Sequence, residues 1–112
     1  MTSQSEMDML VSRAREASSL LKSLSHEARL LIMCHLMGGE KSVTELERSL
    51  GRRQAAVSQQ LARLRLDGLV RARRHGKTIF YSIASQPAAE VLAALQRAMD
   101  AQPEQPEQDA AK

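Results

Sequence analysis

Several residue types are scarce in this 112-residue sequence, which has one cysteine, one tyrosine, one phenylalanine and no tryptophan. A single cysteine excludes an intrachain disulfide, so the fold must hold together without one. No stretch approaches the roughly 20 apolar residues of a membrane span, and the first residues are not a basic segment followed by an apolar run. We therefore expect a cytoplasmic protein that does not enter membranes.

The sequence also lacks the residue patterns of enzymes and metal sites. It shows no paired carboxylates, no nucleophile–base pair and no glycine-rich phosphate loop. His26, His35 and His75 fall on different expected elements, and none forms a ligand cluster with Cys34. We predict neither catalysis nor a metal or other cofactor.

Hydrophobic residues make up 43% of the chain, which at this length supports one packed core rather than two. Because aromatic residues are only 2%, that core must be aliphatic, which suits helices. A helical domain this small often completes its core by dimerising, so we expect a homodimer. The domain is expected over residues 1–100, followed by a disordered acidic tail over 101–112.

Positive charge is concentrated in the middle of the chain. Residues 52–77 contain eight Lys or Arg residues and a single acid, Asp67, although the whole chain has a net charge of only +3. Such a block is typical of a surface that binds a polyanion, and it is equally compatible with a solvated face that keeps the protein soluble.

Apolar spacing and turn residues predict five helices and two strands, a mainly α fold with a β-hairpin. The helices are expected over 5–23, 26–37, 43–50, 54–67 and 88–99, and the strands over 69–74 and 77–83. Ser25 is expected to cap the second helix, and Ser42 with Glu45 to form a capping box before the third. His75-Gly76 is expected to form the hairpin turn.

The third and fourth helices are separated by a short segment that contains Gly51, which is typical of a helix-turn-helix. A hairpin directly after them is a wing, so the order of elements predicts a winged helix-turn-helix that binds double-stranded DNA. A helix about 10 Å wide fits the major groove, and its exposed polar side chains can contact base edges.

The DNA-contacting residues follow from this arrangement. Those expected to contact bases are Gln54, Ala55, Ser58, Gln59 and Arg63. Those expected to contact phosphates are Ser42, Thr44, Arg52, Arg53, Arg73, Arg74 and Lys77.

Three segments closely resemble the ArsR/SmtB family of winged-helix repressors: LLKSLSHEARLLIMCHL, SVTELERSLGRRQAAVSQQLARLRLDGLV and RRHGKTIFYSI. The resemblance implies a homodimer joined by its first and last helices, a fourth helix that reads operator DNA, and an inducer that releases repression. The family's thiolate metal site lies on the third helix, which has no cysteine here, so metal sensing is not expected. Gln60 stands where the family often has His, and Arg53 where it has a Ser-like cap, so operator preference is expected to differ.

Within the family, the sequence is most similar to the branch that senses persulfides or oxidants (BigR-, SqrR- and HlyU-like proteins). That branch has a cysteine on the second helix, matching Cys34, and another on the last helix, where this sequence has Asp100 or a near neighbour. The resemblance therefore implies single-thiol chemistry at a sensor residue Cys34, such as persulfidation or sulfenylation. Cys34 is also compatible with a second interpretation, a small hydrophobe in an apolar helix.

These observations predict a sequence-specific DNA-binding transcriptional regulator, a repressor released by an inducer. A reactive sulfur species or an oxidant acting at Cys34 is the candidate inducer. Two alternatives stay open: a DNA-binding regulator without a ligand, and a helical protein-interaction module. Salt-dependent DNA binding distinguishes them from each other, because the interaction module would show none.

Overall fold

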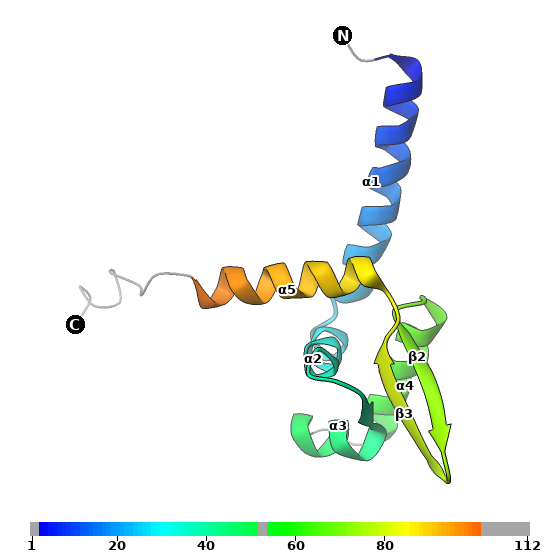
Figure 1. The fold of residues 1–112 in the computed structure, drawn as a ribbon, viewed down its shortest axis with the longest axis vertical. Helices are drawn as coiled ribbons and strands as arrows, with labels where there is room; N and C mark the ends of the chain where they lie inside the picture. The colour runs from blue at the N-terminus through cyan, green and yellow to red at the C-terminus, as the bar shows by residue number, and fades with distance from the viewer. Residues whose placement is uncertain (1–2, 52–53, 102–112) are drawn as a thin grey trace, which may run out of the picture.

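The computed structural model describes residues 3–51 and 54–101, and within them the chain forms five helices and a three-stranded antiparallel sheet (Figure 1). In chain order the elements are α1 (Gln4–Leu24), α2 (Glu27–Leu36), β1 (Lys41–Ser42), α3 (Val43–Leu50), α4 (Gln54–Leu66), β2 (Val70–His75), β3 (Thr78–Ile83) and α5 (Gln86–Asp100). The expected helices and hairpin are confirmed. The short strand β1 was not expected, because two residues are too few to show alternation.

Local hydrogen bonds explain where the helices begin. The Ser42 hydroxyl accepts the Glu45 amide at 3.2 Å, and the Glu45 carboxylate accepts the Ser42 amide at 2.8 Å, which confirms the capping box. The expected cap at Ser25 is wrong: its hydroxyl donates back to the Lys22 carbonyl at 2.9 Å and ends α1. The His26 ring caps α2 instead, because its Nδ1 accepts the Ala28 amide at 3.1 Å.

The sheet has the order β1-β3-β2, and β2 and β3 form the expected hairpin. Its strands close one residue later than expected, because His75 pairs with Thr78 and the loop is Gly76-Lys77. Gly76 has a φ of 64°, a left-handed conformation that favours glycine at the first position of a two-residue hairpin loop.

One aliphatic core lies between α2, α3, α4, the sheet and the first turns of α5. Helix α4 buries Val57, Leu61 and Leu64 along one side, as their spacing predicted. The other fully buried large side chains are Ile32, Met33, Leu46 and Leu92. Leu24 at the end of α1 also belongs to this core, so all five described helices contribute to it, and it fixes α4 firmly against α2 and α3.

Helices α1 and α5 project away from this core (Figure 1). Leu24 is the one buried residue of α1, and large apolar side chains farther along both helices are exposed: Met7, Met9, Leu10, Val11, Leu21, Leu95 and Met99. The radius of gyration is 17.8 Å, whereas a compact domain of about 100 residues has about 13 Å. The two helices therefore present apolar surface that this chain does not cover. Within residues 3–51 and 54–101, none of the helices has both the length and the apolar character of a membrane span.

Candidate nucleic-acid interface

Helix α4 presents a polar surface opposite its buried side. Ser58 and Gln59 are exposed, while Val57 between α4 and the core is buried. Both side chains are therefore accessible to a molecule that binds this side of α4, and their expected base contacts stay predictions. The side chains of Gln54 and Ala55 lie outside the described residues, as do Arg52 and Arg53 before the helix, so the contacts expected for these four residues stay predictions.

Arg63 lies on one flank of α4 rather than on its outermost line. Its Nε is 3.4 Å from Oδ2 of Asp67, one turn farther along the chain. The side chain is exposed, so a contact with DNA requires a rotation away from Asp67 but no rearrangement of the core. The expected base contact of Arg63 stays a prediction.

The two residues expected to bind phosphate at the start of α3 differ in exposure. Thr44 is exposed. Ser42 is only 7% exposed, and its hydroxyl is already engaged in the capping box. Ser42 thus helps to hold the first turn of α3, and its expected phosphate contact is not tested by this geometry.

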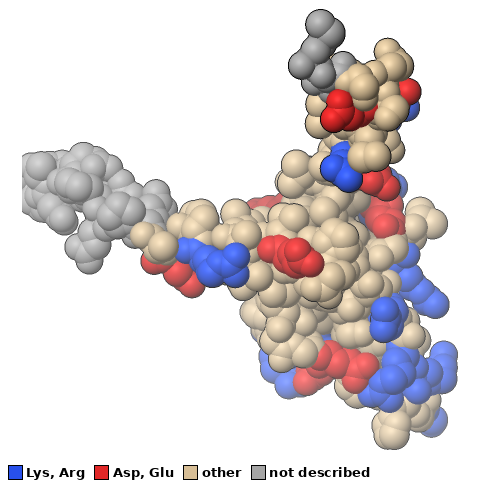
Figure 2. Space-filling model, turned by 45° about the horizontal axis from the view of Figure 1, so that its top comes forward, with Lys and Arg blue, Asp and Glu red and all other residues tan. Residues whose placement is uncertain are grey.

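The hairpin carries the basic surface (Figure 2). Arg71, Arg74 and Lys77 are exposed on it, and β2 packs against α4 at its other end. A basic hairpin next to a polar helix face is the arrangement expected when a helix occupies a groove and a wing meets the adjacent phosphates.

Arg73 differs from the other arginines of the hairpin because its guanidinium group already has a partner within the protein, the Glu40 carboxylate. Arg73 Nε donates to Glu40 Oε2 at 2.9 Å, its Nη2 donates to Glu40 Oε1 at 2.7 Å, and the group lies over the Phe80 ring at 5.2 Å from the centroid. The Arg73 hydrogen bond lowers the pKa of the Glu40 carboxyl below its usual value. The pair therefore fastens the hairpin to the segment between α2 and β1.

Gln60 also takes a role that the sequence did not indicate. It is half-buried, and its Oε1 accepts a hydrogen bond from Arg29 Nη1 at 3.1 Å. Gln60 therefore faces α2 instead of the exposed side of α4. A glutamine on a basic helix gave no sign of this partner, which is 31 residues away in the chain.

Cys34 is half-buried on α2 and packs against the core. Its sulfur is thus neither a free surface group nor a fully enclosed one. In the part of the chain that the structure describes, no group of three or more His, Cys, Asp or Glu side chains is arranged to hold a metal ion.

Comparisons with known proteins find similarity to bacterial transcriptional regulators. Residues 26–72 match the sequence pattern of the family described as "Bacterial regulatory protein, arsR family". The biofilm growth-associated repressor of Xylella fastidiosa (strain 9a5c) is 46% identical over 93 residues, which cover 83% of this chain and 82% of that protein. The transcriptional activator HlyU of Vibrio cholerae is 43% identical over 82 residues, covering 73% of this chain and 76% of that protein.

Solved structures are similar over most of their length. The transcriptional repressor BigR from Xylella fastidiosa superposes with a TM-score of 0.79 at 44% identity, covering 86% of this chain and 98% of that chain. The homodimeric winged helix-turn-helix DNA-binding domain of Mb0332 from Mycobacterium bovis, described as a possible ArsR-family regulator, gives 0.71 at 30% identity, covering 83% and 86%.

Proposed function

This chain belongs to the arsR family of bacterial regulatory proteins, and from that membership we propose that it acts as a homodimer that binds an operator of two half-sites and represses transcription until an inducer releases it. The observation that carries the proposal is the exposed polar side of α4, with Ser58 and Gln59, beside a basic hairpin. BigR is named as a repressor and HlyU as an activator, so repression is the part of the proposal that most needs a reporter assay.

The proposal is tested by selecting bound sequences from a pool of random double-stranded DNA and measuring the salt dependence of binding. We expect enrichment of one inverted repeat, its half-sites about one helical turn apart, and a steep loss of affinity with salt. Failure to enrich any sequence, together with salt-independent retention, would favour the protein-interaction alternative.

The apolar stripe of α1 supports the dimer. Its apolar residues recur at alternating spacings of three and four: Met7, Leu10, Ala14, Ala17, Leu21 and Leu24. This spacing gives a continuous seam along one side of a helix, and such seams pack against other helices. The Mb0332 domain, which is described as homodimeric, has the same fold. We assign the dimer interface to α1 and α5.

Substitutions on the reading helix are expected to relax sequence preference. Ser58→Ala and Gln59→Ala should each cost about 1–3 kcal/mol at the selected operator if the side chain makes a good hydrogen bond to a base, with little effect on random DNA. Affinities for both DNA molecules at one salt concentration give the result. Equal losses on the two would mean that these side chains contact only the sugar-phosphate backbone.

The wing offers a matched pair of arginines. Arg74 is exposed, whereas Arg73 is held by Glu40, so we expect Arg74→Ala to lower affinity for all sequences and to reduce the salt slope by about one unit for each phosphate that it no longer neutralises. Lys77→Ala should behave like Arg74→Ala. Arg73→Ala should change the slope less and instead loosen the hairpin, which amide hydrogen exchange in β2 and β3 would report. Identical slope changes for the two arginine variants would assign both to phosphates.

We place the inducer signal at Cys34, with a persulfide donor or a peroxide as the reagent. Because Cys34 packs against the core, added sulfur or oxygen atoms must displace α2 from its neighbours. The Cys34 thiolate attacks the outer sulfur of a persulfide donor and breaks the donor's S–S bond, which leaves a persulfide on Cys34 and releases the donor's thiolate. Attack on hydrogen peroxide breaks the O–O bond, which leaves a sulfenic acid on Cys34 and releases hydroxide, protonated to water.

We expect Cys34→Ser to keep operator affinity within about threefold, since it lies away from α4's exposed side and the change is small. Either reagent should weaken binding by the native protein but not by Cys34→Ser. Mass spectrometry must confirm the modification, because a fully modified native protein that still binds its operator tightly would make Cys34 a core residue only.

A further inference from the structure

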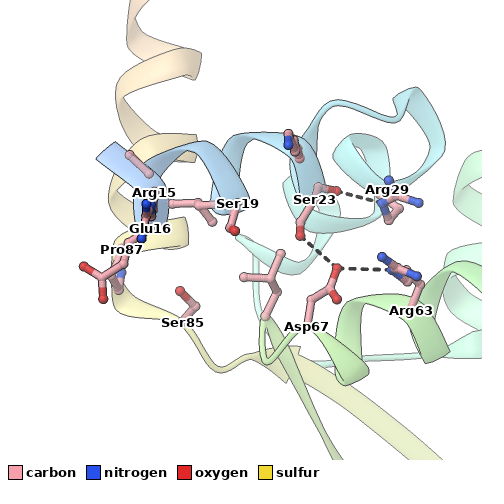
Figure 3. Close-up of a pocket in the computed structure, with 13 residues that line it drawn as sticks. Arg15, Glu16, Ser19, Ser23, Arg29, Arg63, Asp67, Ser85 and Pro87 are labelled. Atoms are coloured by element: carbon pink, nitrogen blue, oxygen red, sulfur yellow. Dashed lines mark hydrogen bonds and ion pairs between the residues drawn. The ribbon is translucent and has the colours of Figure 1, made fainter. Parts of the chain in front are cut away.

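Two side-chain links connect the end of α1 to α4 and to the residue that follows α4, and neither involves a residue expected to contact DNA. The first, between Ser23 and Asp67, is drawn in Figure 3. Ser23 Oγ donates to Asp67 Oδ2 at 2.8 Å. Arg29 forms the second link: its Nε donates to the Ser23 carbonyl at 2.7 Å, and its Nη1 donates to Gln60 Oε1 at 3.1 Å. One guanidinium group thus bridges the last turn of α1 and the middle of α4.

Asp67 directly follows α4 and continues its last turn, because its amide donates to the Arg63 carbonyl, so it shares one flank of the helix with Gln60. Gln60, Arg63 and Asp67 are spaced by three and four residues, so they follow one line on the helix surface. This line lies between the buried side, with Leu64, and the exposed side, with Gln59. Arg63 and Asp67 on this line border an open groove of about 860 Å³, which is also lined by α1 and by Ser85 and Pro87 at the start of α5. Helix α4 therefore has separate sides for the core, for solvent and for α1.

Helix α1 has few other attachments within the described chain. Leu24 is buried, Leu20 and Ser23 are half-buried, and the other residues of the helix as far as Gln4 are exposed. Apolar contacts at one end hold a helix in place without fixing its direction, because the hydrophobic effect is non-directional. Hydrogen bonds are directional, and those from a charged guanidinium or to a carboxylate are the stronger ones. The two links therefore set the direction of α1 relative to α4.

We propose that four side chains form a polar joint between α1, the helix assigned to the dimer interface, and α4, the helix that reads DNA. These side chains are Ser23, Arg29, Gln60 and Asp67. By fixing the angle between the two helices, the joint sets the spacing of half-sites that the dimer accepts. This inference rests on the proposed dimeric operator binding. All four are positioning residues, since they act through α4 and not on DNA. Moving one half-site by a base pair shifts it about 3.4 Å along the duplex and turns it by about 35°, which a rigid joint cannot follow.

The test uses a double variant, Ser23→Ala with Gln60→Leu, which removes both links and leaves every charged residue in place. Affinity is measured for the selected operator and for versions with the spacing shortened or lengthened by one base pair. Native protein should disfavour the altered spacings by about tenfold or more, and the double variant should lose most of that preference, a change within the range of couplings between linked sites.

Matched variants separate positioning from stability. Ser19→Ala makes the same change one turn earlier on α1, in the same groove, and should keep the native spacing preference. Gln60→Glu keeps an oxygen acceptor for Arg29, so this variant should also keep the native spacing preference. A variant that merely unfolds more easily loses affinity for all spacings in the same proportion. The decisive quantity is therefore the ratio of the affinity for the selected operator to the affinity for an operator with altered spacing. An unchanged ratio in the double variant, or a native protein indifferent to spacing, would overturn the joint.

A DNA-free measurement keeps this inference separate from the proposed function. Spin labels at Ser12→Cys and Ala62→Cys, both exposed positions, are placed in a Cys34→Ser background, and labelled protein is diluted with unlabelled protein so that distances within one chain dominate. We expect a narrow α1–α4 distance distribution that broadens in the double variant. If no DNA binding is found, the proposed function fails, while this distribution still supports the joint by broadening or overturns it by staying unchanged.

Discussion

Leu10→Glu is expected to lower affinity for the two-half-site operator by about 10²–10⁴, because it separates a dimer whose two reading helices bind as one unit. Leu10 is 60% exposed in the single chain and lies within the apolar stripe of α1. In the proposed dimer it is covered, and a carboxylate there would be buried without a partner, which is strongly unfavourable.

The size of the effect follows from linkage. Once one half-site is bound, the second reading helix is held near its own half-site at a high effective concentration, and a monomer loses this advantage. Affinity for an isolated half-site should therefore change little in the variant. Leu10 is remote from α4's exposed side, so the weaker binding cannot come from a missing hydrogen bond to a base.

Sedimentation and operator titration give the measurement together. Ser12→Glu is the matched control, because it introduces the same charge two residues along α1, on the side away from the stripe. This control should remain dimeric and bind normally. A Leu10→Glu protein that sediments as a dimer, or that binds the full operator as a monomer without loss, would remove α1 from the interface.

The sequence predicted those features of the fold that arise from short-range patterns. The buried side of α4 follows from apolar residues at intervals of four and three, and the start of α3 follows from the Ser42–Glu45 capping box. The hairpin was expected from its β-branched residues and glycine turn. Each of these signals lies within a few residues, where helix and strand geometry alone decides which side chains meet.

The missed side-chain links join residues that are far apart in the chain. Arg73 and Glu40 are 33 positions apart, and Ser23 and Asp67 are 44 apart. No periodic pattern connects such pairs, so nothing in the sequence separated Arg73 from the other basic residues that we expected to contact phosphates. Ser25 was expected as a cap from residue type alone, but its hydroxyl bonds back to the Lys22 carbonyl, and the adjacent His26 ring caps α2 instead. Long-range polar links therefore needed the three-dimensional arrangement.

Leu61→Ala is expected to destabilise the protein by about 2–5 kcal/mol, a large part of the roughly 5–15 kcal/mol that stabilises a typical domain. Leu61 is 0% exposed, at the centre of the α4 side that packs on the core. Removing its branched end takes away apolar packing and leaves a cavity that the neighbouring helices close only in part. Leu66 is 79% exposed on the same helix, so Leu66→Ala should change stability by only about 0.5 kcal/mol or less.

Urea unfolding at one protein concentration compares the two variants, since the stability of a dimer depends on concentration. The effect of Leu61→Ala on DNA binding should differ from the effect of substitutions on the exposed side of α4, such as Ser58→Ala. Unfolding removes all binding at once, so Leu61→Ala should lower affinity for operator and random DNA in the same proportion. Ser58→Ala should lower affinity for the operator alone. Similar unfolding midpoints for Leu61→Ala and Leu66→Ala would contradict the assignment of the buried side of α4, and with it the side that faces DNA.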